Sequence, residues 1–189
     1  PYINKNKTLG TILNIELFRM KQFQYLTINN ALLYKSYSDQ HFLNWNSTFT
    51  LQYKRNLNLT HRLSIKHSWL EVPEDVQTLN PNFLGNENNK FEFSTLEYHY
   101  ENEKRNSISY PTKGSFNEVL ISAYRGQNDN FKNIKFVLKS ENHFKLYERW
   151  FLGNSLKGKV QTNTKLPYIL NESLGFEDYL RGYEYYVFD

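Results

Sequence analysis

The chain has 189 residues, with 23 Lys and Arg against 19 Asp and Glu, and it contains no cysteine. This length allows about one domain, and the lack of cysteine excludes a disulfide scaffold, a cysteine-ligated zinc site and a thiol enzyme. The net charge of +4, without any run of five or six basic residues, argues against a nucleic-acid partner.

Apolar residues recur at spacing two along most of the chain, which predicts strands with one apolar and one polar face. The clearest case is 57–69, where Leu59, Leu63 and Ile65 alternate with polar residues. In chain order, the predicted strands are 10–20, 23–37, 43–54, 57–70, 91–101, 115–125, 131–145 and 150–163. No segment of helical period separates these strands, so consecutive strands are expected to be antiparallel.

The predicted strands are longer than the usual five or six residues, and their connections alternate in character. The joins near 20–23, 54–57, 102–115 and 146–149 are expected at one end, and those at 38–43, 71–90, 126–131 and 164–189 at the other. Long antiparallel strands fit either a soluble β-sandwich or a transmembrane β-barrel. Short turns opposite long loops, with aromatic residues such as Trp45, Trp69 and Trp150 near strand ends, favour the barrel.

Two short motifs stand out. Pro111-Thr112-Lys113-Gly114 has a proline that cannot donate to a β-ladder and a glycine suited to a positive φ, so it predicts a turn. Leu180-Arg181-Gly182-Tyr183 lies at the end of the long segment 164–189, and its arginine offers five donors that can pin a loop. Taken singly, an ordinary turn and a solvent-exposed arginine are the plainer interpretations.

Together, in this order and with this spacing, the two motifs resemble those of the outer-membrane assembly-factor superfamily, the BamA/TamA or bacterial surface antigen family. The tail Leu174–Asp189 is similar to the version in Bacteroidota members. The chain departs from the family at Gly175-Phe176, where many members have Gly-Gly, and at Leu180, where they have Val. The resemblance covers 91–189, whereas 1–90 match only as barrel strands.

The resemblance implies an all-β fold: an antiparallel transmembrane barrel segment of about eight strands, spanning 1–163, from a barrel of sixteen. The segment 164–189 would be a long extracellular loop that folds into the lumen. Arg181 would contact the inner wall there, with Glu177, Asp178 and the more distant Glu118 as possible partners in this chain. Because the chain begins without Met, we expect it to be part of a longer polypeptide.

By the same resemblance, the protein inserts or transports polypeptides at the bacterial outer membrane and is not an enzyme. The implied partners are outer-membrane lipids and lipopolysaccharide, nascent outer-membrane proteins and accessory assembly subunits. A barrel fused to a patatin-like lipase, a passive outer-membrane pore and a soluble β-sandwich remain as alternatives.

The sequence offers no enzymatic or metal-binding pattern that would change this expectation. The five histidines are scattered, and His61 and His67 are some 20 Å apart along one strand, too far to share a metal. Both are expected to be interfacial or packing residues. Glu101 and Glu103 share one face near a strand end, for which we expect a solvated surface. No catalytic residue, metal ligand or cofactor is predicted.

Overall fold

The computed structural model describes residues 2–4, 8–28, 31–38, 41–85, 88–127, 131–163 and 166–170. In chain order, the described elements are β1 (Leu9–Met20), β2 (Gln22–Ile28), β3 (Ala31–Ser36), β4 (Phe42–Lys54), β5 (Leu59–Glu71), α1 (Asp75–Leu79), β6 (Lys90–Glu103), β7 (Gly114–Gly126), β8 (Lys132–Tyr147), β9 (Trp150–Gln161) and the 3₁₀ helix η2 (Tyr168–Leu170).

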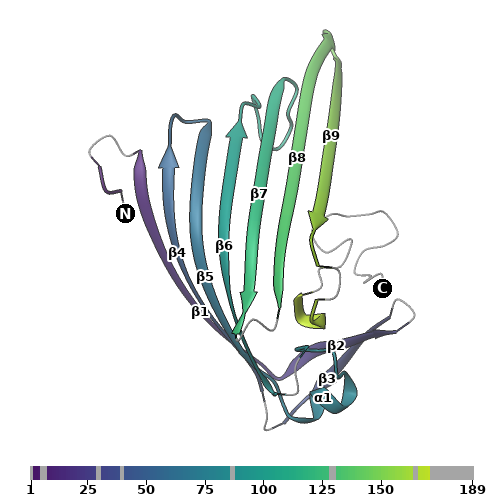
Figure 1. Ribbon diagram of the computed structural model, residues 1–189. Helices are drawn as coiled ribbons and strands as arrows, with labels where there is room; N and C mark the ends of the chain where they lie inside the picture. The colour runs from purple at the N-terminus through teal and green to yellow at the C-terminus, as the bar shows by residue number, and fades with distance from the viewer. Residues whose placement is uncertain are drawn as a thin grey trace.

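Seven of these strands form one antiparallel sheet in the order β1-β4-β5-β6-β7-β8-β9 (Figure 1). Each strand pairs with the next over most of its length; β4 and β5, for example, pair from Leu43 with Glu71 to Lys54 with Thr60. The expectation of an all-β, antiparallel fold is therefore confirmed. The strands β1 and β9 stand at the two edges of the sheet.

The prediction of a single strand at 23–37 is wrong, because this segment folds into the separate hairpin β2–β3. Ile28 pairs with Ala31, so a two-residue connection turns the chain back on itself. The hairpin carries Phe23 into the apolar core, where its ring centroid lies 5.3 Å from that of Phe42. The main sheet consequently has seven strands rather than eight, and β1 pairs directly with β4.

The connections of the sheet separate into two ends. At the turn end, residues 55–58, 104–113 and 148–149 join β4 to β5, β6 to β7 and β8 to β9. At the loop end are the hairpin β2–β3, the helix α1 between β5 and β6, and the 3₁₀ helix η2 that comes after β9 in the chain (Figure 1). The join at 20–23, expected at the turn end, instead leads into the hairpin at the loop end.

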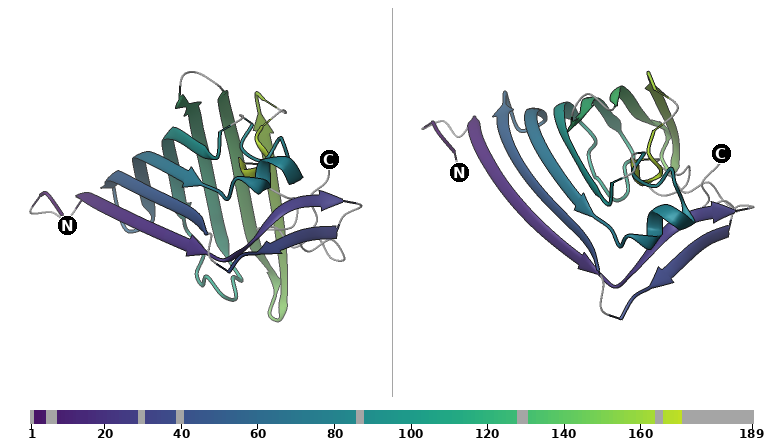
Figure 2. Two further views of the ribbon diagram at one scale, coloured as in Figure 1. Left: turned by 90° about the horizontal axis from the view of Figure 1, so that it is seen from below. Right: turned by 60° about the horizontal axis from the view of Figure 1, so that its bottom comes forward.

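The apolar core lies at the loop end. Figure 2 shows the sheet curving around α1 and η2, with β2–β3 beside them. The core combines residues of these loop segments with residues of the sheet: Phe23, Phe42, Leu70, Val72, Val76, Phe83, Leu84, Phe91, Phe93, Phe131 and Leu166. The loop segments therefore form a packed cap, which we call the loop-end cap, over one end of the curved sheet.

Candidate functional site

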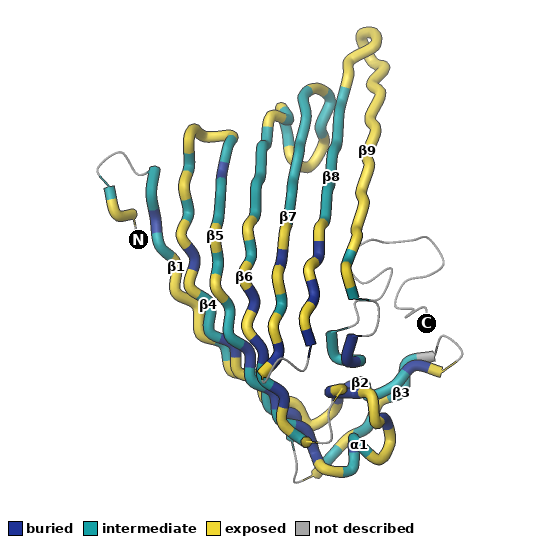
Figure 3. Tube along the Cα trace, viewed as in Figure 1, coloured by how far each residue is buried: buried dark blue, intermediate teal, exposed yellow. Residues whose placement is uncertain are grey.

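One face of the main sheet, the outer face, is apolar and exposed. Strand pairing aligns one row across it, made of Leu13, Phe49, Ile65, Leu96, Ala123 and Ile134. The large side chains of this row are between 44% and 69% exposed, and Figure 3 shows how exposed positions recur along the strands. An apolar surface of this extent is unusual on a protein that faces only water.

Aromatic rings gather on the outer face toward the turn end. The ring centroid of His61 lies 5.4 Å from that of Tyr100 and 6.1 Å from that of Tyr53. Nδ1 of His61 is 2.8 Å from the hydroxyl of Tyr98. These rings are amphipathic, with an apolar body and a polar group, which suits them to a boundary between apolar and aqueous surroundings.

A second aromatic group lies toward the loop end. Trp45 pairs with Trp69 across β4 and β5, and the Trp45 ring meets His67 edge-on at 6.2 Å between centroids. His67 in turn has Nε2 3.2 Å from a carboxylate oxygen of Glu92. Trp69 lies eight positions after His61 in β5, or about 26 Å along the strand at ~3.3 Å per residue. The outer face thus has an apolar band between two aromatic groups.

The apolar band does not run straight across the sheet. In β1 it centres on Ile15, whose row continues through Ser47 to His67 in β5. In β9 it centres on Leu156, whose row runs through β8, β7 and β6 to Leu59 in β5. Over the width of the sheet the band therefore shifts toward the turn end by roughly one residue per strand. A level band would shift in this way if the strands were tilted against it, as in a barrel.

The inner face is polar, and much of it is buried. Thr50 and Ser64 share a hydrogen bond of 2.8 Å between their hydroxyls, and the Ser68 hydroxyl donates to Oδ1 of Asn46 at 2.7 Å. Ser122 is fully buried and its hydroxyl donates to Glu97 at 3.2 Å. The usual arrangement of an apolar inside and a polar outside is therefore reversed along the middle of this sheet.

Charged residues on the inner face are linked in pairs. The Arg62 guanidinium donates to Nδ1 of His99 at 2.9 Å and to Glu101 at 3.2 Å. Because arginine only donates, Nδ1 of His99 must accept, and the Nε2–H of the ring donates to Glu118 at 2.7 Å. Glu118, a predicted partner of Arg181, thus lies on the inner face in contact with His99. Glu101 is ion-paired there, and not simply solvated.

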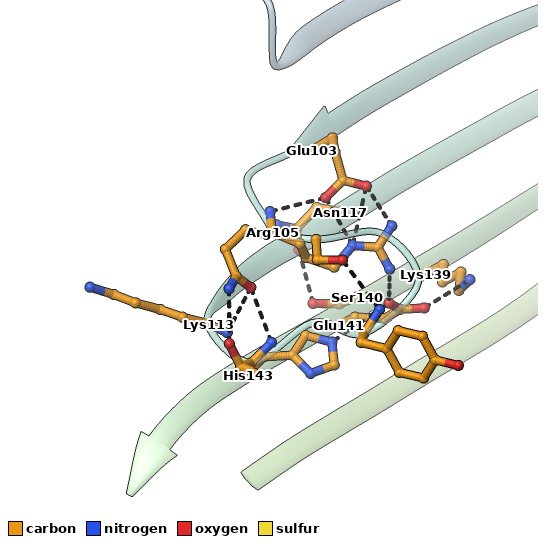
Figure 4. A network of polar contacts seen from close by, with 12 residues as sticks. Glu103, Arg105, Lys113, Asn117, Lys139, Ser140, Glu141 and His143 are labelled. Atoms are coloured by element: carbon orange, nitrogen blue, oxygen red, sulfur yellow. Dashed lines mark hydrogen bonds and ion pairs between the residues drawn. The ribbon is translucent and has the colours of Figure 1, made fainter. Parts of the chain in front are cut away.

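A second cluster ties Arg105, near the start of the 104–113 connection, to charged residues of the inner face (Figure 4). Arg105 donates from Nε to Glu103 at 2.8 Å and from Nη1 to Glu141 in β8 at 2.5 Å. Lys139 also reaches Glu141, at 2.8 Å. The Arg105 side chain is only 11% exposed, and its guanidinium lies 4.6 Å from the centroid of the Phe116 ring.

Sequence reasoning missed this second cluster. Glu103 is predicted on a solvated face, and Arg105 is not among the predicted site residues, because its partner Glu141 lies 36 residues away in the sequence. The available signal was weak: charged residues at inward positions near the ends of two predicted strands.

The Pro111–Gly114 motif forms part of the same connection. Gly114 has a φ of +106°, in the left-handed region, and a Cβ there would lie 2.1 Å from the carbonyl oxygen of Lys104. The side-chain oxygen of Asn106 accepts from the backbone N–H of Thr112 at 3.0 Å and of Lys113 at 3.1 Å. The connection is therefore closely bonded to itself, and only glycine fits at its exit.

At the loop end, a polar lock joins the hairpin to α1. Asp75 accepts from Tyr37 at 2.6 Å and pairs with Lys35. Although partial burial raises the pKa of Asp75, hydrogen bonds from Lys35 and Tyr37 outweigh it and hold that pKa below its usual range. Partial burial and the neighbouring Asp75 carboxylate raise the pKa of Tyr37 above its usual value. The lock therefore favours an ionised Asp75 and a protonated Tyr37.

The chain returns to the inner face after β9. The hydroxyl of Tyr168 in η2 lies 2.7 Å from that of Thr27 in the hairpin. Between residues 166–170 and the inner face is a cavity of about 220 Å³, lined on its two sides by Lys66 and Lys135 and by Leu166 and Ile169. The start of the long segment after β9 thus packs inside the curve of the sheet.

Several predicted site residues lie outside the part of the chain that the structure describes. They are Leu180, Arg181, Gly182, Tyr183, Glu177 and Asp178. Among the described residues, no group of three or more His, Cys, Asp or Glu is arranged to hold a metal ion. Within the same residues, no helix is long and apolar enough to cross a membrane. No family model, no curated protein and no solved structure matches the chain.

Proposed function

We propose that this chain is the central part of a transmembrane β-barrel in the bacterial outer membrane. The observation that carries the proposal is the reversal of the two faces: apolar side chains of the outer face are exposed, while polar side chains of the inner face are buried. In a lipid bilayer the outer face would meet acyl chains and the inner face a polar lumen. A soluble β-sandwich would instead bury the apolar face.

The aromatic groups and the shifted apolar band support the same proposal. Transmembrane barrels carry an apolar band about 25 Å tall between aromatic girdles, on strands tilted by ~35–45°. With such a tilt, the ~26 Å along β5 between His61 and Trp69 corresponds to about 20 Å along the bilayer normal, which is of the same order as the height of that band. The two edge strands would need further strands, because unpaired backbone groups are costly in lipid.

We further infer that the barrel acts in protein insertion or translocation, as the resemblance to the BamA/TamA family implies. Support comes from the order of parts: a Pro111–Gly114 turn, the strands β7, β8 and β9, and then a long segment that starts inside the curve. With seven strands in place of eight, β9 remains the eleventh strand of the family and β1 becomes the fifth. Connections at the turn end and at the loop end still alternate along the chain, as the strand numbering of the family requires.

The mechanism is mechanical rather than chemical. Nascent outer-membrane proteins would add strands at a weak seam of the closed barrel, by pairing of backbone groups. Strands of that seam are not among those described here. The chain would contribute the wall opposite the seam, the segment with Arg181, and contacts with outer-membrane lipids, lipopolysaccharide and accessory subunits.

The passive pore is less favoured because the loop-end cap fills one end of the curve with a packed apolar core. Depletion of the parent protein in its host tests the proposal. We expect folded outer-membrane proteins to fall and to recover with the wild-type gene, but poorly with Arg181→Ala. Unchanged levels of folded outer-membrane proteins after depletion would refute the assembly role and leave a pore or a lipase-linked barrel.

A further inference from the structure

The turn end of the sheet exposes large apolar side chains in or directly beside each of its three connections. Leu57 between β4 and β5 is fully exposed. Ile108 and Tyr110 between β6 and β7 are 73% and 84% exposed, and Tyr147 and Trp150 at the tip of β8–β9 are 71% exposed each. Figure 3 shows these tips as exposed tube at the far end from the loop-end cap. We call this set, with the basic residues that flank it, the turn-end rim.

The flanking charges of the rim are almost all positive. Exposed basic residues accompany each connection: Arg55, Lys104, Lys113, Lys145 and Arg149. Glu148 is the one exposed acidic residue in these three described connections. None of the five basic side chains forms an ion pair among the described residues.

The loop end differs in this respect. Lys90 lies 3.8 Å from a carboxylate oxygen of Glu71, and Lys35 pairs with Asp75. Two loop-end lysines are therefore paired with carboxylates of the chain, whereas the five exposed basic side chains of the turn end form no ion pair with a described residue. An uncompensated positive charge beside an apolar anchor is the pattern that binds proteins to anionic lipid surfaces.

We propose that the turn-end rim binds the anionic headgroups of the adjacent bilayer leaflet. This inference rests on the proposed membrane barrel and adds the lipid class. The rim lies next to the aromatic group at the turn end. Leu57 follows Tyr53 of that group by four residues, and Ile108 follows Tyr100 by eight. Its anchors are single side chains spread from β4 to β9. An interface with a soluble protein would instead gather them into one patch.

The same geometry accounts for the length of β8 and β9. The hairpin β8–β9 extends beyond β7 at the turn end. Gly114, the first residue of β7, lies opposite His143, and β8 continues from there to Tyr147. The apolar band shifts toward the turn end across the sheet, so this extension keeps Phe144 and Leu152 within the band. Tyr147 and Trp150 then come at its boundary, where aromatic side chains are favoured.

Fluorescence quenching of Trp150 by brominated lipids tests the proposal. The full-length protein, with Trp45→Phe, Trp69→Phe and any tryptophan outside this chain replaced, is reconstituted in bilayers. One preparation contains brominated phosphatidylglycerol and the other brominated phosphatidylcholine at the same mole fraction. We expect the anionic lipid to quench Trp150 roughly twice as strongly.

Two matched variants complete the design. Lys145→Gln with Arg149→Gln should equalise the two lipids, while Lys21→Gln with Lys132→Gln, which removes the same charge from the loop end, should keep the preference. Equal quenching by both lipids in the parent protein would overturn the proposal. Absence of quenching by either lipid would also overturn it and point to an acidic protein partner in the aqueous phase.

The failure of this inference is separable from that of the membrane barrel. A protein in which Trp45 is the reporting tryptophan places the probe on the outer face at the other aromatic group. Quenching of Trp45 without any lipid preference at Trp150 would leave the barrel intact and reject only the lipid specificity. A protein that stays soluble without detergent and shows no quenching of Trp45 would reject both.

Discussion

Arg105 and Glu141 lie 36 residues apart in the chain, yet Nη1 of the arginine is 2.5 Å from a carboxylate oxygen of the glutamate. Both side chains are largely buried, with exposed fractions of 11% and 14%. The pair ties the connection between β6 and β7 to the inner face of β8 (Figure 4). This contact crosses β7 and therefore braces three neighbouring strands.

Loss of this brace is expected to be costly. Arg105→Ala leaves Glu103 and Glu141 without their shared cation, and because these contacts are partly buried, we expect a loss below the ~3–5 kcal/mol typical of a fully buried ion pair. We expect a lower midpoint in urea unfolding of the folded barrel, with strand content unchanged in the absence of urea. Arg149→Ala serves as the control, because that side chain is exposed and forms no ion pair with a described residue, and should shift the free energy of unfolding by less than about 0.5 kcal/mol.

A compensated variant refines this prediction. Arg105→Met with Glu103→Gln and Glu141→Gln removes the buried charges together, so it should recover much of the loss. If this triple variant were as unstable as Arg105→Ala, the packing of the guanidinium on Phe116, rather than charge compensation, would be the source of its contribution.

Gly114→Ala tests the turn motif. The new methyl would collide with the backbone of Lys104 at a φ of +106°, so the connection must shift or the strand must start later. A non-glycine residue in this conformation costs about 1–3 kcal/mol, before any clash is counted. We expect slower folding into detergent micelles and a lower unfolding midpoint.

Gly158→Ala is the matched control for that substitution. Gly158 lies in β9 on the outer face, and a Cβ there would meet no heavy atom within 4 Å. Alanine reduces the freedom of the unfolded chain, so this variant should be neutral or slightly more stable. Equal destabilisation by the two substitutions would contradict the special role of Gly114.

The loop-end cap should respond to acid through Asp75. Its pKa is lowered in the folded state, so the carboxylate contributes stability that is present above the ordinary pKa of an aspartate. That contribution is lost as the pH falls through the lowered, folded-state pKa, where protonation breaks the pairing with Lys35. We expect proteolysis within residues 72–85 by an acid-active protease to accelerate below about pH 4.

Asp75→Asn separates this effect from general acid unfolding. The amide does not titrate, so the variant should be cleaved faster already at pH 5 and should change less as the pH falls. A variant with the same acid-dependent acceleration as the wild type would show that other carboxylates control the cap.

The middle of the sheet was predictable, because period-two alternation reports directly on a face. Leu51 and Tyr53 alternate with Thr50 and Gln52, and this pattern locates β4 without knowledge of its neighbours. The hairpin β2–β3 was not predictable in this way. Its residues alternate like those of a barrel strand, and only contacts with distant Phe42 and Phe83 divert Phe23 into the core.

The polar clusters could not be predicted from the sequence for a related reason. Strand pairing decides which charges meet, and pairing is a long-range property. Glu103 reaches Arg105 locally, but the approach of Glu141 depends on the register of β7 with β8, where Phe116 lies opposite Glu141. A shift of one residue would turn Glu141 to the outer face.

Ile65→Arg offers the sharpest test of the environment of the outer face. Ile65 is 58% exposed at the centre of the apolar band, so in a water-soluble protein this change should be nearly neutral. In a bilayer, an arginine at the midplane of a barrel costs about 2–4 kcal/mol, and the cost falls toward the interfaces. We therefore expect Ile65→Arg to destabilise the protein folded in lipid vesicles, as measured by reversible unfolding in guanidinium chloride.

Two further arginine substitutions give that measurement its controls. Leu152→Arg is also on the outer face but lies at the edge of the band, and its cost should be about 0–1 kcal/mol. Thr48→Arg changes the inner face, where an arginine carries no lipid penalty and its new cost is repulsion from Lys66, which lies opposite. A larger loss of unfolding free energy for Ile65→Arg than for Leu152→Arg would show that the cost depends on depth in a bilayer. Equal, small effects at both positions would mean that water surrounds the outer face, and the transmembrane barrel would have to be abandoned.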